Sequence, residues 1–208
     1  MRRVMFVCMA FVAAALMVNA QSQERRPASP RGTAATELGG TWVKGERGQS
    51  YQGGTWIDLS YGRPIKRGRD LFGGGSDLKG LLAGAPVWRA GADQSTRLKT
   101  EVPLVIGGKT VPAGEYSLFI DGKDGQWTLI VSSWPAQQKY DPANNAELWG
   151  AYGYTPDKDV VRVPMTLTKN SLSVDELTWG FADVTTSGGK LVLMWDAVVA
   201  TAPFTLAP

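Results

Sequence analysis

Histidine is absent from this chain of 208 residues, and cysteine occurs once, as Cys8. The lack of histidine removes the usual near-neutral general base and the commonest transition-metal ligand. Cys8 lies in an N-terminal segment that we expect to be cleaved off, so the remaining chain would hold no disulfide, thiol nucleophile or thiolate ligand. Ser-His-Asp and Cys-His catalysis are therefore excluded, and we expect neither a metal site nor a cofactor.

A strong charge imbalance is also missing. The whole chain carries a net charge of +3, and loss of Arg2 and Arg3 by cleavage would leave 20 of the 22 basic residues against 19 acidic ones. A nearly neutral protein has no overall field that attracts nucleic acid, so we do not expect nucleic acid as a partner. The composition gives no indication of the oligomeric state.

The N-terminal segment 1–20 has the three-part layout of a secretory signal peptide. Arg2 and Arg3 form a basic start, residues 4–18 are an apolar run, and the segment ends in the small residue Ala20. We predict cleavage after Ala20 and export to the periplasm or the cell exterior. The alternative is a membrane anchor, but the apolar run is short and polar residues follow it directly, so we expect no membrane span after cleavage.

Helix-length periodic stretches are also missing, and the rest of the chain divides into a leader and one domain. Residues 21–36 contain no large apolar residue, which predicts a flexible leader over residues 21–38. From residue 39 to 208, short β-branched and aromatic runs are separated by Gly, Pro, Asn and Asp, which is typical of an all-β domain. We expect at most one short helix, at residues 76–82.

Alternating apolar and polar residues predict half-buried strands. They lie at residues 55–61, 114–120, 126–132, 160–168, 176–184, 190–195 and 197–206. Glycine-containing turns between them favour antiparallel pairing, so we predict an antiparallel β-sandwich of jelly-roll type. The repeated sequence Gly-Gly-Thr-Trp at 39–42 and 53–56 is interpreted as the two arms of an opening hairpin.

Two clusters combine cations with aromatic residues. Residues 61–72 place Arg63, Lys66, Arg67 and Arg69 next to Tyr61 and Phe72, which suits an anion or sugar site but also a solvated loop. Residues 87–96 place Trp88 beside Arg89, which suits a pocket in which the ring stacks on a ligand and the guanidinium hydrogen-bonds to it. The alternative is that Trp88 belongs to the core and Arg89 pairs with Asp93.

A third cluster lies in the long irregular segment 133–158. It interleaves aromatic residues with amides and carboxylates, a mixture that suits carbohydrate, although the rings could merely fasten the segment to the sandwich. The residues are Trp134, Tyr140, Trp149, Tyr152, Tyr154, Asp141, Asn144, Asn145 and Glu147.

Acidic side chains suggest two other kinds of site, a glycosidase pair and a calcium site. A glycosidase would need two carboxyl groups about 5–10 Å apart. The candidates for such a pair are Glu101, Glu115, Glu147, Asp183 and Asp196. The pairs Asp121/Asp124 and Asp157/Asp159 could supply oxygen ligands for calcium, but they lack the pattern of an EF-hand. The preference of aspartate for turns explains both pairs more simply.

Five motifs in order resemble the secreted bacterial family catalogued as domain of unknown function 2911 (DUF2911). They are Tyr-Gly-Arg-Pro at 61–64, Lys-Arg-Gly-Arg-Asp-Leu-Phe-Gly at 66–73, Val-Trp-Arg-Ala-Gly-Ala at 87–92, Val-Pro-Ala-Gly-Glu-Tyr-Ser-Leu-Phe at 111–119 and Trp-Gly-Ala-Tyr at 149–152. The resemblance covers about residues 55–204 and implies an exported β-rich domain without an established activity. Its matching motif positions are Tyr61, Arg63, Gly68, Arg69, Trp88, Arg89, Gly91, Trp149 and Tyr152.

Together these observations predict a non-catalytic module that binds a sugar-like or anionic small molecule. One alternative is a structural or interaction protein of the cell envelope, in which Arg63 and Arg89 form buried ion pairs with residues such as Asp70 and Asp93. Another alternative is a carboxylate-based enzyme that acts on glycans. The candidate ligand-binding residues are Tyr61, Arg63, Arg69, Trp88, Arg89, Asp93, Trp149 and Tyr152.

Overall fold

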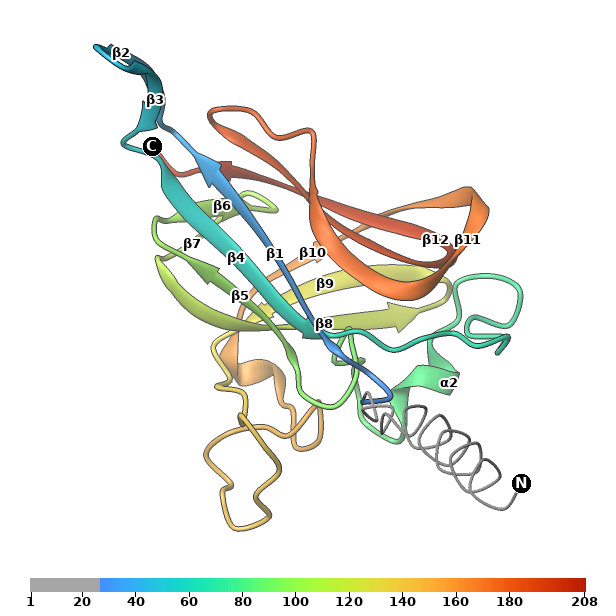
Figure 1. Cartoon of the computed structure of the whole chain (residues 1–208). Helices are drawn as coiled ribbons and strands as arrows, with labels where there is room; N and C mark the ends of the chain where they lie inside the picture. The colour runs from blue at the N-terminus through green and yellow to red at the C-terminus, as the bar shows by residue number, and fades with distance from the viewer. Residues whose placement is uncertain (1–26) are drawn as a thin grey trace, which may run out of the picture.

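The computed structural model describes residues 27–208, so the predicted signal peptide and its cleavage site lie outside the described residues. Within residues 27–208 the fold is all-β and antiparallel, with a single four-residue α-helix, α2 (Lys79–Leu82), and a 3₁₀ turn at Pro156–Lys158. Two sheets pack face to face, which confirms the predicted sandwich (Figure 1).

The larger sheet has six strands in the order β1-β4-β5-β8-β9-β10, and the smaller has four in the order β11-β12-β6-β7. A separate hairpin of β2 and β3 projects from the body (Figure 1). The strands are β1 (Arg31–Leu38), β2 (Thr41–Gly45), β3 (Gly48–Gln52), β4 (Thr55–Gly62), β5 (Thr96–Thr100), β6 (Leu104–Ile106), β7 (Lys109–Val111), β8 (Gly114–Lys123), β9 (Gln126–Ser132), β10 (Asp159–Pro164), β11 (Thr166–Ala182) and β12 (Gly188–Leu206).

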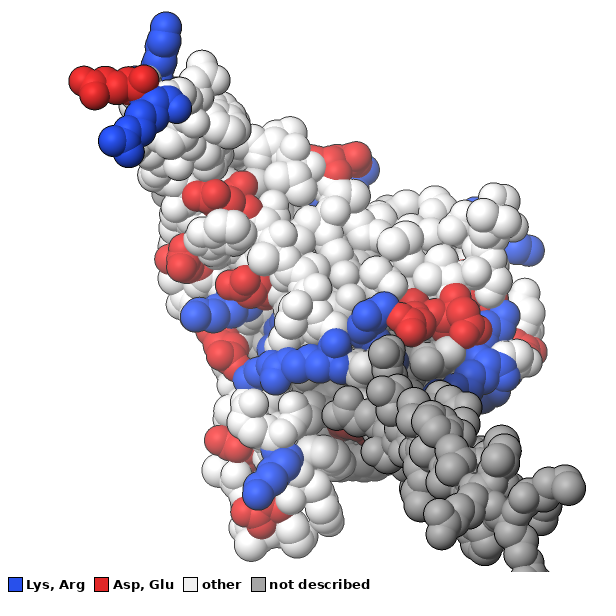
Figure 2. All heavy atoms as spheres, in the orientation of Figure 1, with Lys and Arg blue, Asp and Glu red and all other residues white. Residues whose placement is uncertain are grey.

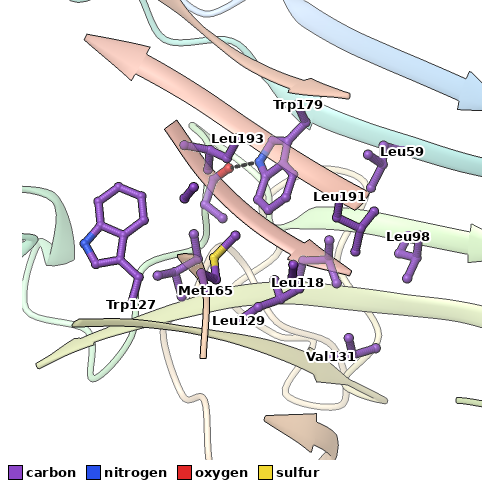
Figure 3. Close-up of a cluster of buried hydrophobic side chains, with 14 of the residues drawn as sticks. Leu59, Leu98, Leu118, Trp127, Leu129, Val131, Met165, Trp179, Leu191 and Leu193 are labelled. Carbon is purple, nitrogen blue, oxygen red and sulfur yellow. Dashed lines mark hydrogen bonds between the residues drawn. The ribbon is translucent and has the colours of Figure 1, made fainter. Parts of the chain in front are cut away.

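The core lies between the two sheets because alternate residues of each strand point inwards. In β4, for example, Ile57, Leu59 and Tyr61 are buried while their neighbours are partly exposed. Trp179 and Leu193 of the smaller sheet face Leu118 and Leu129 of the larger one (Figure 3). Every strand except β2 and β3 contributes to this cluster.

The predicted flexible leader over residues 21–38 is wrong for its second half. Residues 31–38 form β1, which pairs antiparallel with β4 along its whole length. The sequence pattern missed this strand because its inward residues are small: Gly32 and Ala34 precede the single large apolar side chain, Leu38. Backbone hydrogen bonds to β4 and the burial of Leu38 stabilise a strand that side-chain hydrophobicity alone does not predict.

The opening hairpin is confirmed. The first Gly-Gly-Thr-Trp lies at the junction of β1 and β2, and the second lies at the junction of β3 and β4 on the opposite arm.

The predicted strand at 160–168 is in fact two strands, since β10 ends at Pro164 and β11 begins at Thr166 in the other sheet. The helix is shorter than predicted, and none of the helices within residues 27–208 is long and apolar enough to cross a membrane.

The outer face of the larger sheet is covered by residues 133–158, the long segment between β9 and β10. Phe119 and Ile130 point outwards from β8 and β9 and pack against Leu148 and Tyr154 of this segment. Burial raises the pKa of the Tyr154 phenol, which donates a 2.7 Å hydrogen bond to Asp159. The segment therefore has its own small core and is fixed to the sheet.

Candidate functional site

Two adjacent residues, Trp88 and Arg89, face opposite sides of the larger sheet. Trp88 exchanges backbone hydrogen bonds of 2.9 and 2.8 Å with Ile120 of β8, which makes this segment a short extension of the sheet. In extended backbone successive side chains alternate, so Trp88 points into the core, where it is 2% exposed and stacks on Trp195. Arg89 points to the outer face, towards segment 133–158.

The backbone after Arg89 is held in a strained conformation. Ala90 has a φ of 56°, which is unfavourable for a residue with a Cβ. Its carbonyl accepts hydrogen bonds from Trp179 Nε1 (2.8 Å, Figure 3) and from Thr96 Oγ1 (2.9 Å). Such strain persists only where the surroundings determine the geometry, and it is concentrated at functional sites.

The Arg89 side chain lies against the backbone of Gly150. A Cβ at Gly150 would be 3.2 Å from Arg89 Cδ, and Gly150 itself has a φ of +65°, a conformation that favours glycine. The Ser95 hydroxyl donates a hydrogen bond to the Gly150 carbonyl and ties the two segments together. The segment that carries Arg89 is thus tied to segment 133–158.

Arg89 has no counter-ion among residues 27–208. No ion pair joins its guanidinium to a described acidic residue, and its Nε is buried without a hydrogen-bond partner. The predicted alternative of an Arg89–Asp93 pair is therefore not found. Arg63 Nε is likewise buried without a hydrogen-bond partner, but the Arg63 guanidinium has Glu176 as its counter-ion, so of the two it is Arg89 that is suited to receive an anion.

Arg89 lines a cleft that we call the arginine cavity, with a volume of about 570 Å³. Arg69 is on its wall, where it donates hydrogen bonds to the carbonyls of Lys66 (2.9 Å) and Ile65 (2.7 Å) and so fixes the turn. Its further lining residues include Pro64, Arg67, Leu81, Trp88, Asp93 and Trp195.

A second cleft, the central hollow, adjoins the arginine cavity and has a volume of about 330 Å³. The two clefts share Ser29, Ala92 and Asp93. Tyr61 contributes to its wall, although the Tyr61 hydroxyl is used to donate to the Trp179 carbonyl. The other charged and aromatic lining residues are Arg31, Arg97, Lys139 and Trp149.

The third cleft, the aromatic hollow, is formed by segment 133–158 and has a volume of about 690 Å³. It shares Trp149 with the central hollow. Tyr140 and Tyr152 are 62% and 48% exposed in it. Its polar and aromatic lining residues also include Trp134, Asp141, Asn144, Asn145 and Glu147.

Charge is unevenly distributed along this row of clefts. The arginine cavity and the central hollow are lined by six cationic side chains and, among their described residues, one acidic side chain, Asp93. In the aromatic hollow the charged groups are the carboxylates of Asp141 and Glu147. Figure 2 shows Lys and Arg atoms near the end of β4, with a group of Asp and Glu atoms between them. The arginine cavity and the central hollow therefore suit an anion, whereas the aromatic hollow does not.

Arg63 does not line any of the three clefts that hold the other candidate residues. Its guanidinium pairs with Glu176 of β11, and it is not among the residues that line the three clefts. Its pairing with Asp70, predicted in the structural alternative, is also wrong, because Asp70 instead accepts hydrogen bonds from the amides of Phe72 and Gly74. The structure brings together Arg69, Trp88, Arg89 and Asp93 in one cleft, Tyr61 and Trp149 in the next, and Tyr152 in the third.

Lys66 of the same cationic run forms a partly buried ion pair with Asp196, whose oxygen is 2.5 Å from Lys66 Nζ. This hydrogen bond holds the pKa of Asp196 below its usual 3.8. Because the pKa is lowered on folding, the pair stabilises the protein fully above the unfolded-state pKa and loses its effect as pH falls through the folded-state pKa.

We therefore expect Asp196→Asn to destabilise the protein by about 1–2 kcal/mol at pH 7 and by much less at pH 3. Urea unfolding at both pH values measures the difference. Asp183→Asn is the matched control, because Asp183 pairs with Lys190 at an exposed position and such pairs contribute little. A loss at pH 3 equal to the loss at pH 7 would contradict the assigned role of the ion pair.

The acidic candidates for a glycosidase pair are dispersed. Glu115 pairs with Arg97, Glu147 accepts from the Asn144 amide, and Glu101 accepts from the Trp56 amide. None of the clefts described here contains two of the five candidates. Asp121 and Asp159 both pair with Arg162, and residues 27–208 hold no group of three or more acidic side chains that could bind a metal ion.

Sequence reasoning missed three cations of the central hollow. Arg31 lies in the segment predicted to be a flexible leader, and Arg97 lies in a strand that the sequence pattern did not predict. Lys139 lies in segment 133–158, where the predicted candidates are aromatic, amide and acidic residues. The alternation of Thr96, Leu98 and Thr100 with Arg97 and Lys99 is a weak strand signal that would have placed Arg97 on the outer face.

Comparison with known proteins identifies one relationship. The family model described as "Protein of unknown function (DUF2911)" matches residues 45–204, which is more than half of the chain. No curated protein and no solved structure matches it.

Proposed function

This chain belongs to the DUF2911 family, and we propose that it is an anion-binding module whose binding site is the arginine cavity. The observation that carries the proposal is the Arg89 guanidinium. It is partly buried and positioned by a strained backbone, and it has no counter-ion among the described residues. A bound carboxylate or phosphate would supply the missing charge and accept two parallel N–H bonds from the guanidinium.

The cleft is suited to a small molecule. Its volume of about 570 Å³ lies within the range of ligand sites, which is about 300–1,000 Å³. Pro64, Ile65 and Leu81 are among its apolar lining residues, and Arg67 and Arg69 add positive charge. An anion with an apolar or ring-shaped body would therefore satisfy both surfaces.

We further propose that the module works outside the cytoplasm. The support is the sequence of residues 1–20, whose basic start, apolar run and small residue at position 20 have the layout of a cleaved signal. An exported binding module without an anchor would act in the periplasm or be secreted.

Two rival functions are less well supported. A purely structural role would leave Arg63 and Arg89 both paired, whereas only Arg63 has a partner among residues 27–208. A glycan-active enzyme would need two carboxylates in one cleft, and the five candidates lie apart.

We expect Arg89→Met to weaken anion binding strongly because methionine keeps an apolar stem but removes the charge. The measurement is a thermal-shift screen of the purified protein with glucuronate, citrate, inorganic phosphate and sulfate. A ligand at a hundred times its Kd adds about 2.7 kcal/mol of stability, which raises Tm by about 5–10 °C in a protein of this size. In Arg89→Met the affinity should fall by about 10- to 100-fold, so at the same ligand concentration the added stability should fall to about 0.4–1.4 kcal/mol.

Arg47→Met is the matched control, because Arg47 is exposed on the distant β2–β3 hairpin. It should leave the shift unchanged. Arg89→Met should also leave the free energy of unfolding unchanged or raise it, since it removes an unpaired, partly buried cation. No Arg89-dependent shift from any of the four anions, together with a loss of about 3–5 kcal/mol in Arg89→Met, would replace the binding proposal with the structural one.

A further inference from the structure

We infer that the ligand is an oligosaccharide that ends in one acidic sugar and continues in neutral sugars. This inference rests on the proposed function, because it places the acidic group in the arginine cavity. It adds that the neutral part crosses the central hollow and lies in the aromatic hollow.

The three clefts lie next to one another in a row. Ser29, Ala92 and Asp93 line both the arginine cavity and the central hollow, and Trp149 lines both the central hollow and the aromatic hollow. The Arg89 side chain lies close to Gly150, which follows Trp149 in the chain. An extended ligand that follows this row of clefts would contact both ends.

The aromatic hollow is preorganised. Gln137 is only 3% exposed, its amide donates to the carbonyls of Asp141 (3.0 Å) and Asn144 (2.8 Å), and its side-chain oxygen accepts from the Asp141 amide (2.9 Å). These bonds hold the tip of segment 133–158 in one shape. A rigid loop loses little conformational entropy when a ligand binds.

The chemistry of this hollow matches a neutral sugar. The exposed rings of Tyr140 and Tyr152 offer flat apolar surfaces for the CH faces of a pyranose, and Trp149 packs against Tyr140 with ring centroids 5.7 Å apart. Asp141, Asn145 and Glu147 also line this hollow, and carboxylate and amide groups are hydrogen-bond partners for sugar hydroxyl groups, which both donate and accept.

The charge distribution limits the ligand to one acidic end. A second acidic sugar in the aromatic hollow would lie near the carboxylates of Asp141 and Glu147 and be repelled. Anionic and neutral sugars therefore belong at opposite ends of the row. A polymer with a carboxylate on every ring does not fit this pattern.

The experiment measures the affinities of the purified protein by isothermal titration calorimetry. Two probes carry one terminal acidic sugar on neutral sugars: 3′-sialyllactose and glucuronosyl-xylobiose. Their parts are tested alone, as N-acetylneuraminate, glucuronate, lactose and xylobiose, and trigalacturonate supplies a charge on each ring. We expect at least one acidic trisaccharide to bind tenfold or more tightly than its acidic monosaccharide, and trigalacturonate to bind no better than glucuronate.

Variants assign each part of the ligand to its cleft. Tyr152→Ala and Tyr140→Ala should weaken the acidic trisaccharide about tenfold and leave the acidic monosaccharide unchanged. Arg89→Met should weaken both. The control Trp42→Ala removes an equally exposed aromatic ring on the β2–β3 hairpin and should change neither affinity.

The outcomes separate the two proposals. Binding of acidic monosaccharides that depends on Arg89, with no gain for either trisaccharide and no effect of Tyr152→Ala, would overturn this inference and leave the anion-binding function standing. Failure of every acidic probe to bind in an Arg89-dependent way would overturn both. Tighter binding of trigalacturonate than of the singly charged trisaccharides would overturn the limit to one acidic end.

Discussion

Trp88→Ala is expected to lower the free energy of unfolding by about 3–5 kcal/mol, the usual loss when a large aromatic side chain is removed from a core. Trp88 is 2% exposed and stacks on Trp195 at a centroid distance of 6.1 Å, with Trp127 edge-on at 6.0 Å. Alanine would leave a cavity between the two sheets that these fully buried rings cannot close. Urea unfolding followed by circular dichroism measures the loss.

Trp42→Ala is the matched control for this variant. Trp42 lies on the β2–β3 hairpin and is 68% exposed, so its removal should change stability by about 0.5 kcal/mol or less. If Trp88→Ala lost as little as Trp42→Ala while reducing ligand affinity, Trp88 would be a stacking surface for the ligand and its assignment to the core would be wrong.

Gly62→Ala is expected to have the second large effect. A Cβ at Gly62 would lie 2.2 Å from the Ala92 carbonyl oxygen and 2.9 Å from its carbonyl carbon. Both are backbone atoms, so β4 or the segment around Ala92 must move. Overpacking of this kind costs about 1–3 kcal/mol. Displacing Ala92 also moves Asp93, which lines two of the clefts, so anion affinity should fall together with stability.

Gly80→Ala is the control for the same substitution. No other group lies within 4 Å of a Cβ at Gly80, which is an exposed position of α2. Alanine has the higher helix propensity, so this variant should be neutral or more stable by up to about 1 kcal/mol. Equal stabilities of the two variants in thermal denaturation would show that the close approach at Gly62 relaxes without strain.

The sequence predicted strands where large apolar residues alternate with polar ones. Strand β4 and strand β9 were predicted close to their observed limits, because Ile57, Leu59 and Tyr61, and likewise Trp127, Leu129 and Val131, are buried at every second position. Strand β1 was missed because its stability comes from pairing with β4 and from a single large side chain, Leu38. Pairing partners distant in the sequence leave no trace in local periodicity.

The candidate site could be predicted by residue type but not by arrangement. Arg63 and Arg89 are equivalent in the sequence, since each lies in a short motif with an aromatic neighbour. Only the fold shows that Arg63 meets Glu176, 113 positions further on, whereas Arg89 lies against Gly150 and has no counter-ion among the described residues. The contiguity of the three clefts depends on how segment 133–158 folds over β8 and β9, which no local pattern encodes.

The pairing of β12 with both β11 and β6 has a consequence for the order of folding. This strand runs from residue 188 to 206, so the four-stranded sheet closes only after β12 has met β6, which lies at residues 104–106. Contacts between residues so far apart in sequence form slowly because a long loop must first be closed. Until then the apolar face of the six-stranded sheet lacks part of its cover.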